Sequence, residues 1–453
     1  MRVKISDILK ATGGKLLCGD EAVAVTSFFT DSRQAKAGAM FVPIRGERAD
    51  GHDYIPAVLE SPAAATFTDH EIPLGEKPIV LVKDCREALQ KAAAWYREQF
   101  AIPVVGVTGS VGKTTAKEMV AQALTAKFRV LKTAGNQNSQ VGVPITVCGL
   151  KKDHTAAVVE MGVSMPGEMA RIAAVVKPTC AVMTNIGVSH IEFMKTRENI
   201  LKEKAHIADY IPVDGALFVN GDDDLLPTLK ETLGGKVVTF GLGPTCDWRA
   251  YGLNEADKGT FFTCLSPAGE KTEVFVPAAG EHNVRNALAA MAVARYLGVP
   301  AEDAVRAISA YKAPAMRQQV VEAGGLLIID DSYNASPDSM RSAIDVLATR
   351  PVTGKRAAVL ADMLELGDFS QQGHYEVGSY ARGRGVELLV AVGPLAKGIA
   401  AGYGPEAHWF ATNEEATAFL QEALRPGDAV LVKGSRGMRT DEIVAALTAG
   451  QEA

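Results

Sequence analysis

A glycine-rich loop between a predicted strand and a predicted helix constrains the fold of this 453-residue chain more than any other feature. The strand is expected over residues 102–107, and the loop runs Thr108-Gly109-Ser110-Val111-Gly112-Lys113-Thr114-Thr115. Apolar residues then recur at helical spacing from Ala116 to Leu124. Glycines let backbone N–H groups turn toward a phosphate, and the helix N-terminus adds partial positive charge. The pattern therefore predicts an α/β domain that binds a nucleotide phosphate chain.

The loop also predicts which nucleotide binds and how. Lys113 is expected to place its charge on the β- and γ-phosphates, and Thr114 to ligate Mg²⁺. Val107 stands where the usual phosphate-loop pattern has its first glycine, so the match is G-x-x-G-K-T. Neither a D-x-x-G segment nor an N-K-x-D guanine-reading segment follows, which argues against a GTPase switch. We expect ATP, contacted by residues 108–115.

The bulk properties describe a multidomain globular protein with no charge-driven partner. The length exceeds that of a single hydrophobic core, so three domains are expected. The net charge of -6 argues against binding nucleic acid or anionic lipid by overall charge. No apolar run approaches the roughly 20 residues that span a bilayer, and Asp7 lies where a signal peptide needs its apolar core. We expect a cytoplasmic monomer without membrane insertion. The six scattered cysteines predict buried, reduced thiols.

The distribution of apolar runs divides the chain into three α/β domains. Residues 1–83 mix short apolar runs with turns, which predicts a small α/β domain. Residues 84–312 begin with a helical pattern and continue as strands alternating with helices, which predicts a parallel sheet. Residues 313–453 repeat that alternation and predict a Rossmann-like α/β domain.

Two polar side chains follow predicted strands of the central domain and are candidate metal ligands. Glu160 comes directly after the strand over 156–159, and His190 follows the strand over 181–183. The carboxyl ends of parallel strands meet at one edge of a sheet, and loop-bound Mg²⁺ takes one or two extra carboxylates. A solvated Glu160 and a structural His190 stay open on this evidence. Lys204 falls on a charged helix, and the pattern alone places it on a solvated face.

Taken together, these segments resemble the central domain of the Mur ligase family of ATP-dependent amide-bond ligases in order and spacing. They are Gly109 to Thr115, Gly135-Asn136-Gln137-Asn138 before Gly142-Val143-Pro144, Glu160-Met161-Gly162, and Thr184-Asn185-Ile186-Gly187 with His190. The resemblance implies two Mg²⁺ sites, one with Thr114 and Glu160 and the other with His190 and a carbamylated Lys204. It makes Lys113, His190 and Lys204 catalytic and places Asn136 and Asn138 at the substrate. Lys202 is the alternative to Lys204, because His206 stands where family members usually have Glu.

Further segments resemble the nucleotide contacts that this family draws from two domains. The run from Gly280 to Asn286 resembles its G-x-H-N-x-x-N segment, which implies that His282 and Asn283 pack against adenine. A plain helix start there is the other reading, and both can hold. The string from Asp330 to Met340 resembles D-D-x-Y-N-A-x-P-x-S-M, and it implies that Asp331 and Asn334 hold the ribose. Arg317 matches an arginine that reaches the phosphates.

The outer segments imply the two remaining substrate contacts. Thr30 to Arg33 and Phe41 to His52 resemble the family's UDP-sugar domain, so Ser32, Arg45 and Gly46 are expected at the uridine diphosphate. Near the C-terminus, Lys433 and Arg436 are candidates for the carboxylate of an incoming dipeptide, with solvated surface charge as the alternative.

The resemblance implies an ATP-dependent ligase that adds D-alanyl-D-alanine to UDP-N-acetylmuramoyl-tripeptide through an acyl phosphate. The products are the UDP-muramoyl-pentapeptide precursor of peptidoglycan, ADP and phosphate. A MurE-type or folylpolyglutamate-type ligase with another acceptor is the first alternative. A non-enzymatic nucleotide-binding regulator is the second.

Overall fold

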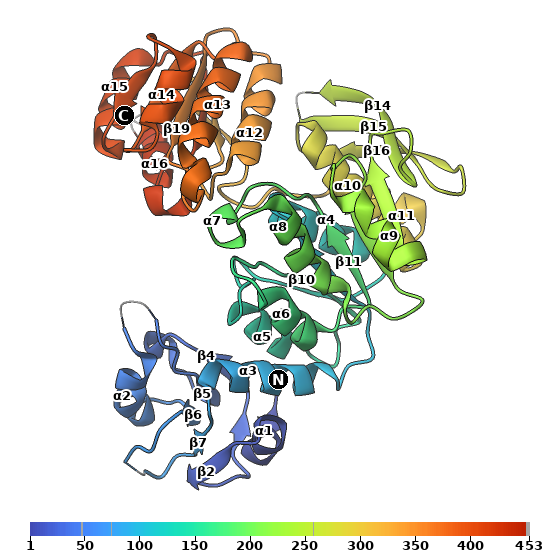
Figure 1. Ribbon diagram of the computed structural model, residues 1–453, viewed down its shortest axis with the longest axis vertical. Helices are drawn as coiled ribbons and strands as arrows, with labels where there is room; N and C mark the ends of the chain where they lie inside the picture. The colour runs from blue at the N-terminus through green and yellow to red at the C-terminus, as the bar shows by residue number, and fades with distance from the viewer. Residues whose placement is uncertain (47–48, 74, 257, 450–453) are drawn as a thin grey trace.

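The computed structural model describes residues 1–46, 49–73, 75–256 and 258–449. They form three α/β domains in chain order, each built around its own sheet (Figure 1). The predicted fold class is therefore confirmed. No helix in the described ranges is long and apolar enough to cross a bilayer.

The N-terminal domain has a five-stranded sheet in the order β2-β7-β6-β5-β4. Its strands are β2 Lys15–Cys18, β4 Ser27–Phe29, β5 Ala39–Phe41, β6 Ala65–Thr68 and β7 Ile79–Leu81. Only β2 is antiparallel to its neighbour. A two-stranded ribbon and the helical segments complete the domain: β1 Val3–Lys4, β3 Ala24–Val25, α1 Ile5–Thr12, α2 Ile55–Glu60, η1 Ser32–Gln34 and η2 Gly51–Tyr54. Phe41 and Phe67 are fully buried in its core.

The middle domain has a nine-stranded sheet in the order β16-β15-β14-β13-β12-β11-β8-β10-β9. The strands are β8 Val104–Thr108, β9 Val130–Lys132, β10 Ala156–Glu160, β11 Cys180–Met183, β12 Ala216–Asn220, β13 Val237–Gly241, β14 Trp248–Ala256, β15 Gly259–Leu265 and β16 Lys271–Val276. The predicted parallel sheet covers β8 to β13, and three further strands extend it: β14 is parallel to β13, and the β14–β15 and β15–β16 pairs are antiparallel. The prediction omitted them because their outer face is solvated, so polar residues interrupt the apolar runs.

Helices cover both faces of the middle sheet. They are α3 Cys85–Arg97, α4 Lys113–Leu124, α5 Gly142–Cys148, α6 Glu168–Val176, α7 Ile191–Met194, α8 Arg197–Ala205, α9 Leu229–Leu233, α10 Glu281–Tyr296 and α11 Ala301–Ser309, with the short turns η3 His206–Ala208, η4 Leu226–Thr228 and η5 Gly234–Lys236. On one face, α4, α10 and α11 pack into one core. On the other, α3, α5 and α6 pack into a core that continues into the N-terminal domain through Leu89 of α3. The helix α3 therefore joins the first two domains.

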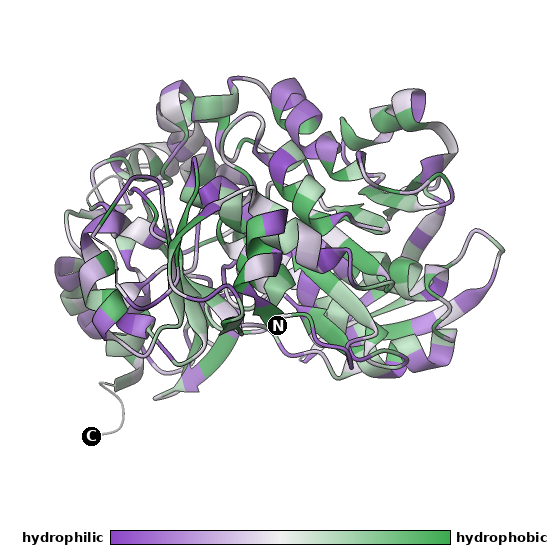
Figure 2. Cartoon of the chain, turned by 90° about the horizontal axis from the view of Figure 1, so that it is seen from below, coloured by the Kyte–Doolittle hydropathy of each residue, from purple (hydrophilic) through white to green (hydrophobic). Residues whose placement is uncertain are grey.

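The C-terminal domain has a six-stranded sheet in the order β17-β18-β22-β19-β20-β21, parallel except for the edge strand β17. Its elements are β17 Gln319–Ala323, β18 Leu326–Asp330, α12 Pro337–Thr349, β19 Arg356–Ala361, η6 Gly367–Phe369, α13 Ser370–Gly383, β20 Leu388–Val392, α14 Lys397–Tyr403, β21 His408–Phe410, α15 Asn413–Ala423, β22 Ala429–Lys433, η7 Arg436–Met438 and α16 Asp441–Ala449. Separate hydrophobic cores fill the two faces. Figure 2 shows the hydrophobic residues gathered in the strands and the hydrophilic ones on the outer helices.

The cysteines match the prediction only in part. All six are free, and Cys85, Cys148, Cys180 and Cys264 are buried. Cys18 and Cys246 are only half-buried, so the expectation of burial was wrong for these two.

The pair α13 and α14 packs closely enough to need glycine, which gives a stability test. A Cβ added at Gly378 would overlap the carbonyl oxygen of Ile399, whereas one added at Gly383 in the same helix meets no atom within 4 Å. Gly378→Ala is therefore expected to lower the free energy of unfolding by about 1–3 kcal/mol through overpacking. Gly383→Ala is the matched control and should be neutral or stabilising, since Ala favours helix over Gly by roughly 0.5–1 kcal/mol. Urea unfolding of both variants measures the difference, and equal midpoints would contradict the packing argument.

Candidate active site

A cleft of about 1580 Å³ is lined by the middle and C-terminal domains. Small-molecule pockets are roughly 300–1,000 Å³, so this cleft has room for more than one small ligand. Many of the predicted site residues line it: Ser110, Val111, Gly112, Lys113, Thr114, Thr115, Asn138, Glu160, His190, His282, Asn283, Arg317, Asp331 and Asn334.

The remaining predicted residues do not line this cleft in the described structure. Thr108 and Gly109 begin the phosphate loop and are buried, Asn136 is exposed, and Lys204 is buried. Ser32, Arg45 and Gly46 belong to the N-terminal domain, as their predicted role at a different part of the substrate requires.

The phosphate loop is held by the neighbouring strand end as well as by its own glycines. Asn185, which follows β11, accepts hydrogen bonds from two loop amides: its backbone oxygen from Ser110 N at 2.9 Å and its Oδ1 from Val111 N at 2.8 Å. Gly109 and Gly112 have φ of 147° and 82°, and a Cβ on Gly109 would overlap the Thr184 side chain. Glycine is therefore needed here by conformation and by space.

Lys113 lies folded over the loop. Its Nζ donates to the carbonyl oxygens of Gly109, at 2.9 Å, and Ser110, at 3.1 Å. Burial lowers the pKa of Lys113, while the Glu160 carboxylate acts in the opposite direction. The ammonium is thus aimed into a loop built for phosphate oxygens.

Glu160 ends β10 and lies opposite Val107 of β8, at the strand edge that carries the phosphate loop. It is only 1% exposed. Its Oε1 accepts from Thr114 Oγ1 at 3.1 Å and from Asn138 Nδ2 at 2.7 Å. Its Oε2 has no hydrogen-bond partner among the described residues. A buried carboxylate oxygen without a donor is expensive, and a cation bound beside it removes that cost.

Lys117 was missed by the sequence analysis. It is 1% exposed, and its Nζ lies 3.7 Å from Glu160 Oε2 and donates to Thr133 O at 2.8 Å. The available signal was its spacing: it follows Lys113 by four residues in α4, so both face the same side of the helix.

Lys204 is 1% exposed, so the expected solvated position was wrong, whereas the alternative Lys202 is exposed. The pattern misled because the charged neighbours Glu203 and Lys204 both face inward. Glu203 accepts from the amides of Gly167 and Met169, each at 2.7 Å. Lys204 Nζ has no hydrogen-bond partner in the described structure. Burial, helped by the nearby charge of Lys113, lowers the pKa of Lys204 to about 7.

His190 links the two walls of the cleft. It has a left-handed backbone, with φ of 62°, and its Nδ1 lies 2.6 Å from Oε2 of Glu365 in the C-terminal domain. That hydrogen bond to His190 lowers the pKa of Glu365. With the proton on Nδ1, the Nε2 lone pair is left for a ligand or a metal. The sequence analysis predicted no role for Glu365.

The predicted adenine segment forms the start of α10. His282 Nε2 lies 2.9 Å from Gln318 Oε1, and Asn283 Nδ2 donates to Ala279 O at 2.8 Å. Both side chains line the cleft. Gln318, which follows Arg317, was missed by the sequence analysis.

The C-terminal wall is organised by a buried ion pair. Lys433 Nζ lies 2.6 Å from Asp331 Oδ2 and donates to Asn334 O at 2.8 Å. Lys433 is 2% exposed and therefore holds the Asp331 to Asn334 turn rather than forming surface charge. Arg436 is exposed and pairs with Asp441. The Arg317 guanidinium stacks 3.9 Å from the Tyr333 ring centroid.

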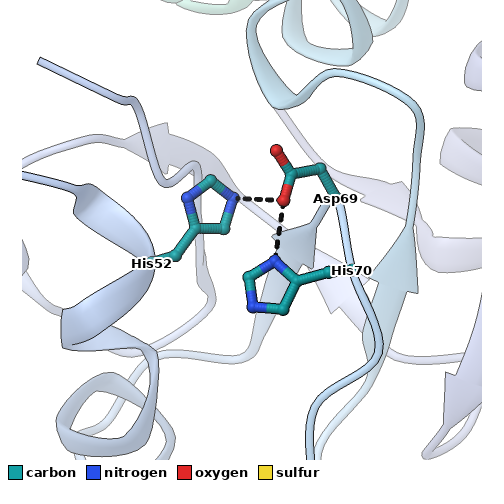
Figure 3. A group of neighbouring side chains, drawn as sticks. All are labelled: His52, Asp69 and His70. Carbon is teal, nitrogen blue, oxygen red and sulfur yellow. Dashed lines mark hydrogen bonds and ion pairs between the residues drawn. The ribbon is translucent and has the colours of Figure 1, made fainter.

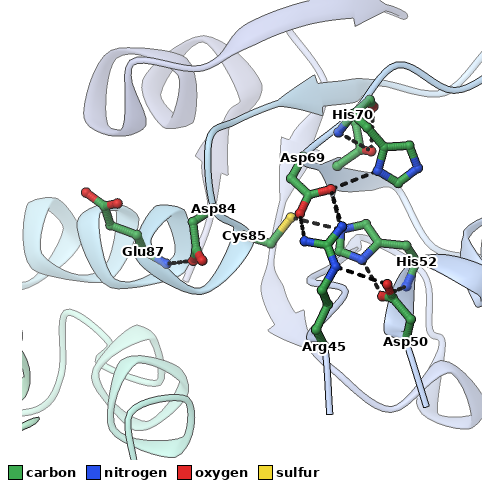
Figure 4. Close-up of polar contacts among 9 residues, drawn as sticks. Arg45, Asp50, His52, Asp69, His70, Asp84, Cys85 and Glu87 are labelled. Carbon is green, nitrogen blue, oxygen red and sulfur yellow. Dashed lines mark hydrogen bonds and ion pairs between the residues drawn. The ribbon is translucent and has the colours of Figure 1, made fainter. Parts of the chain in front are cut away.

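In the N-terminal domain, the predicted diphosphate contact Arg45 is already paired. Its guanidinium contacts Asp50, with Nε 3.1 Å from Oδ2, and Asp69 (Figure 4). Ser32 begins η1, where Asp31 caps the turn. Glu47 and Arg48 of the quoted UDP-type segment lie outside the described residues.

Comparison with protein families finds matches along most of the chain. The model of the Mur ligase family, catalytic domain, matches residues 25–97. The Mur ligase middle domain matches residues 107–294, and the Mur ligase, glutamate ligase domain, matches residues 316–436.

Individual relatives match over nearly the full length. The UDP-N-acetylmuramoyl-tripeptide--D-alanyl-D-alanine ligase of Bacillus subtilis is 35% identical, over 94% of this chain and 93% of the relative. Among solved structures, MurF from Acinetobacter baumannii is similar at a TM-score of 0.93 and 32% identity, covering 99% of each chain. MurF ligase from Thermotoga maritima in complex with ADP is similar at a TM-score of 0.85 and 28% identity, covering 94% of this chain and 98% of that one.

Lys433 forms a buried ion pair and Arg436 an exposed one, so we expect their replacement to lower the stability of the protein by unequal amounts. Lys433→Met leaves the Asp331 carboxylate buried without a counter-charge, so we expect a loss of about 3–5 kcal/mol of unfolding free energy. Arg436→Met breaks an exposed pair and should cost about 0–1 kcal/mol. Urea unfolding followed by tryptophan fluorescence measures both, and equal losses would contradict the assignment.

The buried amine of Lys204 predicts a pH-dependent stability. Its folded pKa of about 7 lies below the unfolded value of about 10.4, so between these values only the unfolded chain holds the extra proton. The free energy of unfolding contributed by Lys204 therefore rises with pH across this window, and the burial penalty is fully present below it. In CO₂-free buffer, Lys204→Met should melt above wild type near pH 7, and the gap should shrink toward pH 10.

The control for this test is Lys202→Met, an exposed change in the same helix that should follow the wild-type melting curve at every pH. A gap between Lys204→Met and wild type that stays constant from pH 7 to pH 10 argues against a neutral buried amine.

Proposed function

Because the chain belongs to the Mur ligase family, we propose that it adds D-alanyl-D-alanine to UDP-N-acetylmuramoyl-tripeptide with conversion of ATP to ADP and phosphate. It is an ATP-dependent, amide-bond-forming ligase, and its product is the UDP-muramoyl-pentapeptide used in peptidoglycan synthesis. The observation that carries the proposal is one cleft with the phosphate loop on one wall and the Asp331 to Asn334 turn on the other.

We propose that ATP lies across this cleft between the two domains. Residues 108–115 hold the phosphates, and Lys113 exchanges its carbonyl contacts for phosphate oxygens. His282 and Asn283 contact adenine at the start of α10. From the other wall, Asp331 and Asn334 hold the ribose, and Arg317 reaches the phosphates.

The residues present fit two Mg²⁺ ions. The unpartnered Glu160 Oε2, with Thr114 beside it, suits the first ion. His190 and Lys204 suit the second when the amine of Lys204 adds to CO₂, forming an N–C bond and releasing a proton to give a carbamate. When bound, Mg²⁺ supplies positive charge against the transferring phosphoryl group.

The proposed reaction has two steps, and the side chains named above hold its reactants. The terminal carboxylate of the tripeptide attacks the γ-phosphorus of ATP, the bond to ADP breaks, and an acyl phosphate forms. The D-alanyl-D-alanine amine then attacks the acyl carbon, loses a proton, and displaces phosphate. Lys113 stabilises charge on the phosphoryl oxygens, and the two walls of the cleft orient the reactants.

The muramoyl substrate extends from this cleft toward the N-terminal domain in our proposal. Ser32, Arg45 and Gly46 bind the uridine diphosphate, with Arg45 exchanging an aspartate partner for a phosphate. Asn136 and Asn138 lie on the peptide side. The domain limits 1–83, 84–312 and 313–453, a monomeric state and a cytoplasmic location belong to the same proposal.

Two rival functions make different predictions about the acceptor. A MurE-type or folylpolyglutamate-type ligase uses a single amino acid, and a nucleotide-binding regulator forms no ADP in response to any acceptor. The string from Asp330 to Met340 favours the dipeptide, because single-residue ligases of the family mostly carry an Asp-x-Tyr-Ala/Gly-His-x-Pro version.

Lys113→Ala is expected to lower phosphate release in the presence of UDP-muramoyl-tripeptide and D-alanyl-D-alanine by on the order of 100- to 1,000-fold or more. The cause is loss of the ammonium that faces the phosphates. A coupled phosphate assay with wild type, Lys113→Ala and Lys152→Ala measures it, since Lys152 is exposed in the same domain.

The same assay tests the acceptor. Wild type receives D-alanyl-D-alanine, diaminopimelate, lysine or glutamate in parallel with UDP-muramoyl substrates. We expect turnover only with the dipeptide. Turnover that depends on a single amino acid, or unchanged activity of Lys113→Ala, would overturn the proposal.

A further inference from the structure

Three metal-ligating side chains lie close together in the N-terminal domain, outside the cleft described above, and a cysteine lies beside one of them. His52 lies in η2, Asp69 and His70 follow β6, and Cys85 begins α3. His52 Nε2 lies 3.3 Å from Asp69 Oδ1 and 3.6 Å from Cys85 Sγ, and His70 Nδ1 lies 2.8 Å from the same Asp69 oxygen. Figure 3 shows both imidazoles turned toward that oxygen. The ligand atoms of His52, Asp69 and His70 lie within 4.8 Å of one another, and the Cys85 sulfur lies beside the imidazole of His52.

Both ring nitrogens of His52 face carboxylate oxygens. Its Nδ1 lies 2.6 Å from Asp50 Oδ1, while its Nε2 faces Asp69 (Figure 4). A neutral imidazole carries one N–H, so one of its nitrogens must face a carboxylate without a proton between them. His52 is buried, with a side chain only 5% exposed, so bulk water does not relieve this conflict. The Cys85 S–H lies beside Nε2, and a metal cation held between Nε2 and Asp69 Oδ1 would relieve the conflict more fully.

The charges around the cluster also favour a bound cation. Asp50 and Asp69 carry two negative charges, and Arg45 supplies one positive charge to both. One negative charge therefore stays uncompensated when the imidazoles are neutral. Arg45 is 58% exposed in its side chain, so it can release Asp69 Oδ1 and keep the other carboxylate oxygen.

We propose that His52, Asp69, His70 and Cys85 bind one Zn²⁺ ion. Two imidazoles, a carboxylate and a thiolate form a donor set that zinc prefers, whereas Mg²⁺ prefers oxygen alone. Tetrahedral zinc with bonds of about 2.0–2.3 Å places its ligand atoms roughly 3.3–3.8 Å apart. The 3.3 Å and 3.6 Å separations at His52 already match that spacing. Asp50 then plays the supporting role of a carboxylate that fixes the tautomer of a zinc-bound histidine.

Binding is coupled to loss of the thiol proton. Burial, with the nearby Asp69 and Asp84 carboxylates, raises the pKa of the Cys85 thiol to about 12. The S–H proton passes to solvent as the S–Zn bond forms, so affinity increases with pH. The ion joins η2, the segment after β6 and helix α3, and α3 carries the core that the first two domains share. The site is therefore structural and lies next to Arg45.

The test uses the full-length protein and Co²⁺ as a spectroscopic probe for the zinc site. We expect one equivalent of Co²⁺ to produce near-ultraviolet sulfur-to-cobalt charge transfer, and Zn²⁺ to remove it. The Glu160 and His190 region has no cysteine among its lining residues, so the band reports only the N-terminal site. His70→Ala should weaken binding at least 10-fold, and Cys85→Ser should abolish the band.

Cys18→Ser is the matched control, a half-buried thiol in the same domain whose loss should leave the band unchanged. Circular dichroism and acceptor-dependent turnover establish that each variant is folded. His70 is half-exposed in its side chain, so its replacement is well tolerated in the fold. The proposal is overturned if no saturable band appears, if the band survives Cys85→Ser, or if His70→Ala binds like wild type. It is equally overturned if ¹⁵N chemical shifts show His52 protonated on both nitrogens after Zn²⁺ is added.

Discussion

The attachment of the phosphate loop to its neighbouring strand ends is the constraint on which the rest of the active site depends. The loop leaves strand β8, and it is tied to the segment after β11 through Asn185 and to β10 through Thr114 and Glu160. Because β10 and β11 flank β8 in parallel, their carboxyl ends deliver these side chains without a long connection. A change of one residue in the strand register would turn the Glu160 side chain to the opposite face of the sheet and remove its carboxylate from the site.

The C-terminal wall of the cleft is positioned against the middle-domain wall by a side-chain pair and by close packing at two glycines. His190 pairs with Glu365, and Gly187 lies so close to Asp338 that a Cβ would overlap its carboxylate. Gly367 packs closely against Glu192, so that an added Cβ would lie 3.2 Å from the Cα of Glu192. These contacts join the segment after β11 to the C-terminal domain, so the orientation of the His190 ring depends on a residue of the other domain.

The sequence predicted those parts of the molecule in which one local signal suffices. Buried parallel strands such as β8 and β20 are continuous apolar runs, so they were located nearly to the residue. The three strands β14 to β16 were missed because a strand with one solvated face alternates apolar and polar residues and so has no continuous apolar run. Glu160 and His190 were placed at the cleft because residues after parallel strands gather at one edge of the sheet, which is a rule about position. Glu365 was not, since its partner His190 lies 175 residues away. Lys117 was overlooked although its spacing from Lys113 was visible in the sequence.

Lys204 is the clearest case of a role set by tertiary structure. Its helix α8 has charged residues on every side, and a helix of that kind normally lies in solvent. Here α8 packs beside α6, and Glu203 replaces water as the acceptor for the amides at the start of α6. That cap holds the helix in an orientation that buries the next residue as well. The burial of Lys204 is thus a consequence of a neighbouring helix cap, which a single-helix pattern cannot contain.

Several buried polar atoms at the cleft lack a hydrogen-bond partner within the described structure, and these atoms favour the binding of a ligand. Glu160 Oε2, Lys204 Nζ and Asp338 Oδ2 are buried without a hydrogen-bond partner in the described part of the chain, and all three lie at or just behind its walls. A buried polar group without a hydrogen bond costs on the order of 1–3 kcal/mol. A ligand that supplies cations and phosphate oxygens removes several of these costs at once. These groups come from both walls, so a ligand that contacts them is bound by both domains.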